Sequence, residues 1–428
     1  MPGAGTRTAI TTNNPPDGIT ARCLDLTRLI SRVGRGPLTG VDRVELAYLT
    51  RLLEDPLPLY LLVRTALGYV LLDKAGAGQI AARINREVVW GAPDLIGRLS
   101  RKASPAKRRA EADLRRFAIA RCRRGRLASM LGRVLPPGCA YLNVGHSNLG
   151  TEVLQAWRGL PKPKISILVH DMIPLDYPQY QRAGTSATFE AKMRRVAGAA
   201  DLIICNSRQT RADVTRWFAT WDAQANTVVA HLGVDLPVAD AAFMPPDIDL
   251  SGPYFLMLGT IEPRKNHALL LDIWESFARD LPSADIPQLI IAGSRGWENH
   301  DVFARLDALP RNDSPVQERA GLTDAQVAGL MDQAAGVLFP SFAEGYGLPA
   351  AEAISLGAPV ICSKLPVFEE FLGNIPVYAE SADVYLWKQS ILQLAEQKRA
   401  GQTGGTAKSL DFDTPTWAEH FNLVLKMT

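Results

Sequence analysis

Short apolar runs alternate with amphipathic segments along most of the chain, a pattern typical of strands that alternate with helices. In the first half, this pattern predicts strands at residues 59–63, 140–144, 165–169 and 202–205 and helices at 43–53, 188–199 and 210–218. In the second half, it predicts strands at 254–258, 288–292, 336–339 and 360–362 and helices near 266–278, 323–333 and 348–356. This order predicts an α/β fold in which helices cover parallel sheets.

The length of 428 residues predicts two domains, because one ordinary core rarely grows to that size. Residues 234–253 lie between the two halves and hold four prolines with little periodicity, which indicates a linker. We therefore expect an N-terminal domain over residues 1–238 and a C-terminal domain over 239–415. A short last helix is predicted at 416–425.

Composition is that of a globular protein, with 47% apolar and 21% charged residues. Uninterrupted apolar runs stay below 18 residues, and residues 1–18 lack the apolar centre of a signal peptide, so we expect a cytoplasmic protein. The five cysteines are scattered without a CxxC pair, which disfavours structural zinc and a disulfide framework.

Positive charge is concentrated between Arg101 and Arg126, where eleven Lys or Arg residues face only Glu111 and Asp113. Apolar positions in this stretch recur at helical spacing and predict a basic amphipathic helix; they are Leu114, Phe117, Ala118 and Cys122. Such a helix suits an anionic membrane surface at the inner face of the cell membrane, or it is a solvated face packed on its own domain. Nucleic acid is disfavoured, because the stretch has one aromatic residue and no recognisable binding motif.

Two carboxylates, Glu344 and Glu352, stand eight positions apart across a turn that opens a helix. Gly345 and Gly347 permit backbone conformations closed to other residues, so that N–H groups can turn toward an anion. Pro349 suits the first helical position, where the helix dipole adds positive charge. The segment predicts a site for a sugar diphosphate, in which the carboxylates accept hydrogen bonds from hydroxyls. The alternative is a strand, turn and helix with one solvated and one helix-stabilising glutamate.

Polar groups also follow other predicted strands, at the edge where α/β sheets bind ligands. Arg264 and Lys265 open a helix after the strand 254–258. The guanidinium of the arginine could bind one phosphate with two hydrogen bonds and the ammonium of the lysine could bind another. The alternative is that both are solvated charges in the first turn of the helix. Gly293 follows the strand 288–292 and allows close approach of a ligand.

The first half has three further candidates. His170 is suited to hydrogen-bond a reacting sugar, unless it is satisfied locally, and Asp171 can orient its loop or fix the imidazole tautomer. Gly40 opens a helix and allows a phosphate to approach, and Ser207 follows the strand 202–205.

The segment from Glu344 to Glu352, with Gly345, Tyr346, Gly347 and Pro349 inside it, resembles the E-x7-E motif of retaining GT-B glycosyltransferases. Residues 259–266 and the His170-Asp171 pair resemble family 4 of that group, and the likeness spans about residues 160–380. The resemblance implies two Rossmann-like domains that face a cleft. The N-terminal domain would hold the acceptor and the C-terminal domain the nucleotide sugar, with the last helix, 416–428, packed back on the first domain.

The resemblance also implies roles for single residues. Arg264 and Lys265 would bind the diphosphate, Glu352 the ribose hydroxyls and Glu344 the donor sugar, while His170 would lie beside the transferred sugar. Together, His170, Glu344, Arg264 and Lys265 form the expected catalytic set, and the expected donor site also includes Gly40, Thr260, Gly293, Gly345, Tyr346, Gly347 and Glu352. Asp171 and Ser207 are expected on the acceptor side. Thr260 departs from the family pattern, since many members carry an arginine there, and Arg264 is expected to take over its charge.

By family resemblance the reaction is the metal-independent transfer of a hexose with retention of configuration. GDP-mannose is the first donor to try, with other GDP-, UDP- and dTDP-sugars as alternatives. The expected acceptor is a growing surface polysaccharide or a lipid-linked sugar. Asp247-Ile248-Asp249 matches the DxD pattern of metal-dependent transferases, but it lies in the proline-rich linker, so we expect neither a metal nor another cofactor.

Three other functions compete with this one. A nucleotide-sugar epimerase or a phosphorylase on the same scaffold would need other catalytic groups in the cleft. A catalytically silent binding subunit is disfavoured because the polar residues of the motifs are intact. A dinucleotide oxidoreductase is disfavoured because no GxGxxG follows the early strands.

Overall fold

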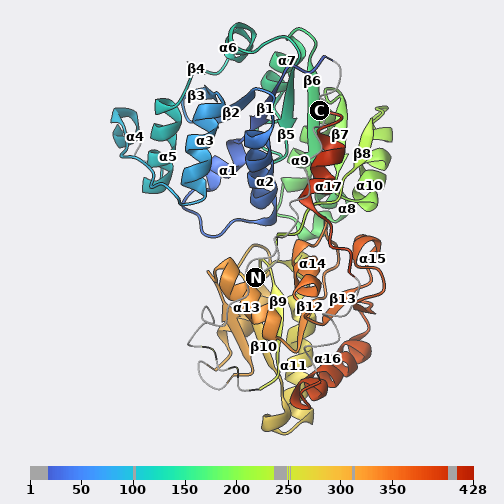
Figure 1. The fold of residues 1–428 in the computed structure, drawn as a ribbon. Helices are drawn as coiled ribbons and strands as arrows, with labels where there is room; N and C mark the ends of the chain where they lie inside the picture. Colours follow the sequence, from blue (N-terminus) through green and yellow to red (C-terminus); the bar gives the residue numbers. More distant parts are fainter. Residues whose placement is uncertain are drawn as a thin grey trace, which may run out of the picture.

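The computed structural model describes residues 18–99, 103–235, 248, 250, 252–310, 314–402 and 412–428. Within these residues the chain forms two α/β domains, each built on its own sheet and stacked one above the other in Figure 1. The predicted α/β fold with parallel sheets is therefore confirmed. No helix in the described part of the chain has the length and apolar character needed to cross a membrane.

The N-terminal domain is built on an eight-stranded sheet of order β4-β3-β2-β1-β5-β6-β7-β8. Its strands are β1 (Ala21–Asp25), β2 (Leu59–Thr65), β3 (Gly68–Leu72), β4 (Ala120–Cys122), β5 (Cys139–Asn143), β6 (Lys164–Val169), β7 (Leu202–Cys205) and β8 (Thr227–Val229). All neighbours pair in parallel except β2 with β3 and β3 with β4. Every residue of β1 and β5 is buried, because helices cover both faces of a parallel sheet.

The helices of this domain are α1 (Thr27–Arg32), α2 (Gly40–Glu54), α3 (Lys74–Ile84), α4 (Leu95–Leu99), α5 (Pro105–Arg116), α6 (Leu127–Val134), α7 (Thr151–Arg158), α8 (Ile173–Asp176), α9 (Thr185–Ala197) and α10 (Arg208–Ala219). A capping box fixes the start of α2: Asp42 accepts hydrogen bonds from the backbone N–H and the hydroxyl of Thr39. Gly40, the first residue of α2, faces the other domain, since a Cβ there would lie 3.8 Å from the side chain of Leu348.

The C-terminal domain has a six-stranded parallel sheet of order β11-β10-β9-β12-β13-β14. Its strands are β9 (Tyr254–Leu258), β10 (Gln288–Ala292), β11 (Val316–Arg319), β12 (Gly336–Phe339), β13 (Val360–Ser363) and β14 (Val377–Ala379). Its helices are α11 (His267–Asp280), α12 (His300–Asp307), α13 (Asp324–Gln333), α14 (Leu348–Ser355), α15 (Pro366–Leu372) and α16 (Val384–Arg399). Strand order reverses at β9, and ligands of such sheets bind where the order reverses.

The last helix, α17 (Trp417–Val424), lies in the N-terminal domain beside α2, where Figure 1 draws it in red. The rings of Tyr48 and Phe421 meet edge to face with centroids 4.9 Å apart. The guanidinium of Arg22 donates to the backbone carbonyls of Leu425 and Thr428, both at 3.0 Å. The chain therefore crosses from one domain to the other twice.

The single basic helix predicted between Arg101 and Arg126 is wrong. Helix α5 begins at Pro105, after the N-cap Ser104, and ends at Arg116. The following residues turn into β4, which pairs antiparallel with β3 at the edge of the sheet. Apolar spacing misled the prediction because Cys122 belongs to this edge strand. Arg101 and Lys102, and the predicted domain boundary near residue 238, lie outside the described residues.

Candidate active site

A cleft of about 860 Å³ lies between the two domains. It is lined by residues that follow β6, β9, β10 and β12 and by the start of α2. Of the residues predicted for the donor and catalytic sites, all line this cleft: Gly40, His170, Thr260, Arg264, Lys265, Gly293, Glu344, Gly345, Tyr346, Gly347 and Glu352. Asp171, predicted for the acceptor side, lines it as well.

Glu344 is the centre of a buried polar cluster at the cleft floor. One oxygen of its carboxylate accepts hydrogen bonds from Lys265 Nζ and Ser341 Oγ, both at 2.6 Å, and the other accepts one from Arg264 at 2.9 Å. Burial alone raises the pKa of Glu344, but the charges of Lys265 and Arg264 outweigh it and hold the pKa at about 2. Glu344 is therefore an ionised acceptor at every physiological pH.

Arg264 is held by a second carboxylate and by the backbone. Glu262 accepts from it at 2.6 Å, and the carbonyl of Ala343 accepts from it across the turn after β12. The negative charges of Glu262 and Glu344 balance the positive charges of Arg264 and Lys265, so the cluster has no net charge. The cations are thus fixed in place before a ligand arrives, and the carboxylates that hold them line the same cleft.

Glu352 lies in α14 and makes its ion pair with the other domain. Its carboxylate is 6% exposed and accepts a hydrogen bond from Arg43 of α2. Arg43 also approaches Asp324, at the start of α13, to 3.3 Å. Burial raises the pKa of Glu352, against the opposing charge of Arg43. The carboxylate that was predicted to bind the ribose is therefore already paired with Arg43.

The two glycines of the turn serve different purposes. Gly347 has a φ of +96°, a left-handed conformation that suits glycine and begins α14. Gly345 does not need positive φ; a Cβ there would lie 2.9 Å from the carbonyl oxygen of His170 and 3.0 Å from Asp171. The prediction of a special backbone conformation is thus wrong for Gly345, where the close approach of the other domain excludes a side chain.

His170 stands opposite this turn, at the end of β6. Its Nε2 lies 2.6 Å from the carbonyl oxygen of Val144, so Nε2 carries the proton and donates it. Burial lowers the pKa of His170 to about 4, which leaves a neutral ring. The unprotonated Nδ1 is then an acceptor suited to a sugar hydroxyl. Asp171 orients the loop as predicted, since its carboxylate accepts the N–H of Ile173 at 3.1 Å.

Two predicted residues have a different environment from the one expected. Ser207 is fully buried and does not line the cleft, because its hydroxyl caps α10 by accepting the N–H of Thr210. Gly293 lines the cleft, but a Cβ there would meet the carbonyl oxygen of Gly259 at 1.9 Å, so a neighbouring backbone already requires glycine. Tyr346 also lines the cleft, and its hydroxyl donates to the carbonyl of Leu232 at 3.1 Å.

Sequence reasoning missed the arginines that α1 and the following loop contribute to the cleft: Arg28, Arg32 and Arg35. Arg28 and Arg32 share the buried carboxylate of Asp42, at 3.1 and 3.2 Å. The helix α1 has only six residues, too few to show a helical period. In the sequence, Gly34 and Gly36 on either side of Arg35 could have indicated a turn that presents this arginine. Both glycines have positive φ in the structure.

The arrangement suits a ligand with a diphosphate and hydroxyls. Cations at the cleft floor and the start of α14 provide for negative charge, and Glu344, Glu352 and His170 provide acceptors for hydroxyls. Among the described residues, no group of three or more His, Cys, Asp or Glu is placed to hold a metal ion. Asp247 and Asp249 of the DxD match lie outside those residues.

Comparison with known proteins agrees with this chemistry. The family described as "Family 4 Glycosyltransferase in conflict systems" matches residues 126–425. The serotype-specific mannosyltransferase WbdA of Escherichia coli is 31% identical over 281 residues, covering 60% of this chain and 33% of WbdA. The O-antigen chain mannosyltransferase B of Escherichia coli is 29% identical over 229 residues, covering 52% of this chain and 59% of the relative. The chain thus spans about a third of WbdA and less than two thirds of the second relative.

Solved structures share the fold. HepE of Anabaena, in complex with UDP-glucose, superposes with a TM-score of 0.58 at 14% identity, covering 95% of this chain and 97% of HepE. OtsA superposes with a TM-score of 0.53 at 12% identity, covering 71% of this chain and 76% of OtsA. The two-domain arrangement is therefore the GT-B fold, as the sequence predicted.

Proposed function

The chain belongs to the family 4 glycosyltransferases in conflict systems, and from this membership and the geometry of the cleft we propose that it transfers mannose from GDP-mannose to a glycan or lipid-linked acceptor of a surface polysaccharide. Membership in a family of glycosyltransferases supports the transfer of a sugar. The choice of mannose is supported by relatives named mannosyltransferases, two of them O-antigen chain enzymes. The cytoplasmic location expected from the sequence stays a prediction.

One observation carries the proposal: a preformed cation pair and a neutral histidine face each other across one cleft. Arg264 and Lys265 are fixed by Glu344 on the C-terminal side, and the His170-Asp171 loop abuts Gly345 from the N-terminal side. A donor bound between them would have its diphosphate beside the cations and its sugar between Glu344 and His170.

The reaction develops negative charge on the departing diphosphate and positive charge on the sugar ring. Arg264 and Lys265 would stabilise the first charge without reorganising, because carboxylates already hold them. Glu344 would accept hydrogen bonds from the sugar hydroxyls and keep its own negative charge near the ring. The pKa of about 2 supports this role, because the carboxylate stays ionised when the donor binds.

We further propose that the transfer retains anomeric configuration and requires no divalent metal. Attack from the face of the leaving group would let the departing phosphate take the proton of the acceptor hydroxyl. The neutral His170 would accept a hydrogen bond from a sugar hydroxyl through Nδ1 and would not act as the proton acceptor, since its pKa is about 4. Both features rest on the family resemblance and on the cations that already occupy the cleft.

Nucleotide release from a panel of GDP-, UDP- and dTDP-sugars, with and without extracted lipid-linked glycans, tests the proposal. GDP release that depends on both GDP-mannose and acceptor supports it, and α-linked product by NMR supports retention. Acceptor-dependent release from another sugar nucleotide would overturn the choice of donor. Conversion of a nucleotide sugar without acceptor would indicate the epimerase, and phosphate-dependent cleavage of a glycan would indicate the phosphorylase.

A further inference from the structure

Exposed apolar side chains gather on one side of the N-terminal domain, away from the cleft floor. Seven large apolar residues of this domain are exposed within residues 67–119, and five of them fall in the short segment 88–99. Leu95 and Leu99 of α4 are 77% and 82% exposed, and Val89 just before them is 79% exposed. Single exposed apolar residues are ordinary, but a contiguous set on one segment indicates a contact surface.

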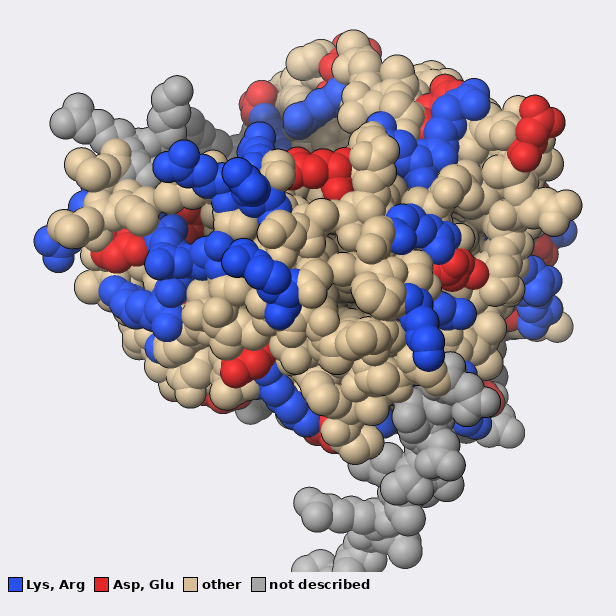
Figure 2. Space-filling model, turned by 90° about the horizontal axis from the view of Figure 1, so that it is seen from above, with Lys and Arg blue, Asp and Glu red and all other residues tan. Residues whose placement is uncertain are grey.

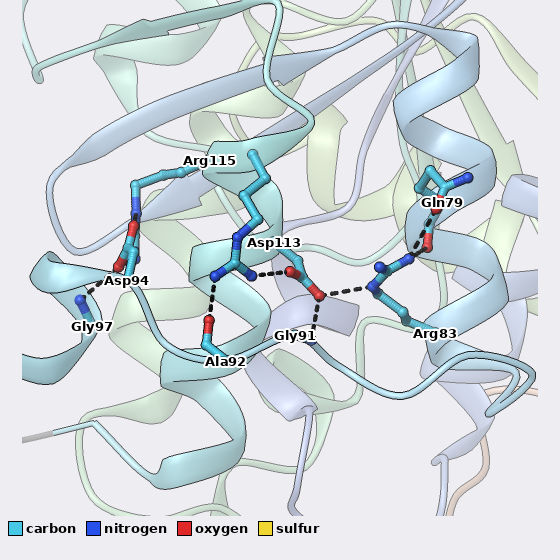
Figure 3. A network of polar contacts seen from close by, with 9 residues as sticks. Gln79, Arg83, Gly91, Ala92, Asp94, Gly97, Asp113 and Arg115 are labelled. Carbon is cyan, nitrogen blue, oxygen red and sulfur yellow. Dashed lines mark hydrogen bonds and ion pairs between the residues drawn. The ribbon is translucent and has the colours of Figure 1, made fainter.

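A buried network of charges holds this segment in place (Figure 3). Asp113 of α5 is 1% exposed and accepts hydrogen bonds from the N–H of Gly91 at 2.8 Å and from Arg83 of α3 at 2.7 Å. Arg116 contacts the same carboxylate and donates to the carbonyl of Ala92. The segment before α4 is thus fixed to two helices of the domain.

Helix α4 itself is fixed by a second carboxylate. Arg115 donates two hydrogen bonds to Asp94, at 2.6 and 2.7 Å, and Asp94 also accepts the N–H of Gly97 at 2.8 Å. Gly97 is buried against the backbone of α5, where a Cβ would lie 3.2 Å from the carbonyl oxygen of Arg108. Helix α4 is therefore tied to α5, and Leu95 and Leu99 remain exposed on it.

Positive charge surrounds these leucines. Arg86, Arg98, Arg109 and Arg116 are exposed on the same segments. Of the acidic residues described there, Glu111 and Asp113 are buried, Asp94 is partly exposed and paired with Arg115, and Glu87 is exposed. Figure 2 shows lysine and arginine side chains gathered on the left of the view, the side on which α4, α5 and β4 lie in Figure 1. Apolar side chains that project among arginines match the interface of an anionic bilayer.

A groove lies next to the active-site cleft. It has a volume of about 430 Å³ and shares Arg32, Pro37 and Leu38 with the cleft. It is also lined by Arg86 and Trp90, which lie in the chain between α3 and α4. The segment that carries the exposed apolar residues therefore begins beside a groove that borders the cleft.

We propose that Val88, Val89 and the helix α4 form a docking face that inserts Leu95 and Leu99 into the headgroup region of an anionic membrane. The exposed arginines contact lipid phosphates and orient the groove toward the bilayer. The proposed membrane contact thus lies on the helix that precedes residues 101–126, where the sequence analysis expected it, and α5 holds that helix in place. The inference is independent of the donor sugar in the proposed function.

Co-sedimentation of the full chain with vesicles tests the docking face. Binding is expected to vesicles of equal parts phosphatidylethanolamine and phosphatidylglycerol, and not to phosphatidylcholine alone. L95S/L99S is expected to lower the partition coefficient at least about tenfold. Tyr385→Ser is the matched control, since Tyr385 is 75% exposed on α16 of the other domain, and this variant is expected to bind like the wild type.

A charge-reversal variant, R98E/R109E, separates insertion from electrostatic attraction: its loss of binding relative to the wild type is expected to be large at low salt and small at high salt, where the attraction is screened. Unchanged thermal unfolding and unchanged nucleotide release with a soluble acceptor would show that the variants are folded and that the cleft works. Equal vesicle binding by wild type and L95S/L99S would overturn the proposal. So would a wild-type dimer that L95S/L99S converts to monomer, because a second copy would then be the partner of this face.

Discussion

The guanidinium of Arg43 on α2 and the carboxylate of Glu352 on α14 form an ion pair between the two domains. The pair joins α2 of the N-terminal domain to α14 of the C-terminal domain, and both residues line the cleft. Because Glu352 is the residue proposed to bind the ribose, donor binding must exchange one partner of this carboxylate for another.

Arg43 and Glu352 are expected to be energetically coupled. Glu352→Gln and Arg43→Met should each lower the free energy of unfolding by about 1–3 kcal/mol, because each breaks an ion pair between partly buried groups. The double variant should lose less than the sum, which gives a coupling energy of about 1–2 kcal/mol in urea unfolding. Strict additivity would show that the ion pair contributes no net stability.

Loss of the cations at the cleft floor is expected to lower activity more than stability. Lys265→Ala should reduce kcat/KM for nucleotide release by about 10²–10³, the usual effect of removing a group that stabilises developing charge. Lys388→Ala is the control, since Lys388 forms an exposed ion pair with Asp280 on the far side of the domain. Full activity of Lys265→Ala, or equal losses in both variants, would contradict the assignment.

Glu344→Gln is expected to abolish most activity while keeping the shape of the side chain. The amide can still accept hydrogen bonds, but it removes the charge that holds Lys265 and Arg264 in place. Nucleotide binding measured by calorimetry should persist, because the freed cations still attract a diphosphate. Loss of both binding and catalysis would show instead that Glu344 is needed to build the phosphate site.

Gly345→Ala is expected to weaken the contact between the two domains. Its Cβ would press on the carbonyl oxygen of His170, and overpacking of this kind costs about 1–3 kcal/mol. Thermal unfolding should start at a lower temperature, and activity should fall together with stability. Gly78→Ala is the control, because Gly78 lies in the middle of α3 and a Cβ there would meet no atom within 4 Å. This variant should be neutral or slightly stabilising. A fully stable and active Gly345→Ala would refute the close contact.

Acid is expected to destabilise the protein below pH 6.5. His420 donates from Nδ1 to the carbonyl of His231 at 2.9 Å and accepts from Tyr48 at 2.8 Å, and burial lowers its pKa from 6.5 to about 4. Between these values the unfolded chain binds a proton that the folded chain does not, so stability falls as the pH falls. The contribution of one such histidine is up to about 3 kcal/mol.

Urea unfolding at pH 7 and pH 5 measures this effect. His420→Gln should be less stable than the wild type at pH 7 and should show a smaller loss between the two pH values. His170 is also buried with a pKa of about 4 and adds to the slope, so the variant should keep part of the pH dependence. An unchanged slope in His420→Gln would contradict the assignment of its neutral state.

The sequence predicted buried strands well because their apolar runs are continuous. Strands β7, β9, β10 and β12 have the predicted bounds, since residues in the middle of a parallel sheet are covered on both faces. Strands β1, β3, β4, β8, β11 and β14 were missed. Strands β4, β8, β11 and β14 have only three or four residues, too few to show a pattern, and the buried Arg22 interrupts the apolar run of β1. The error at Cys122 has the same origin, since three residues of an edge strand carry no period of their own.

The residues predicted at strand ends line one cleft, whereas the contacts between the domains were missed. Arg264 and Lys265 follow β9 and Glu344 follows β12, its neighbour in the sheet, so their convergence follows from the strand order. The partner of Glu352 is Arg43, 309 positions away, and no local pattern indicates that pairing. Ser207 was misplaced because a serine at a strand end can cap the next helix as readily as it can bind a ligand.

The return of α17 to the first domain has a mechanical consequence. The two segments by which the chain passes between the domains touch at the N-terminal domain, where Val234 donates to the carbonyl of Pro415 at 3.0 Å and Gly233 packs against Trp417. Two adjacent tethers permit bending about the line that joins them and resist twisting. We therefore expect the cleft to open and close by a hinge rotation about this line. His170 would then return to the same position against Gly345 at each closure.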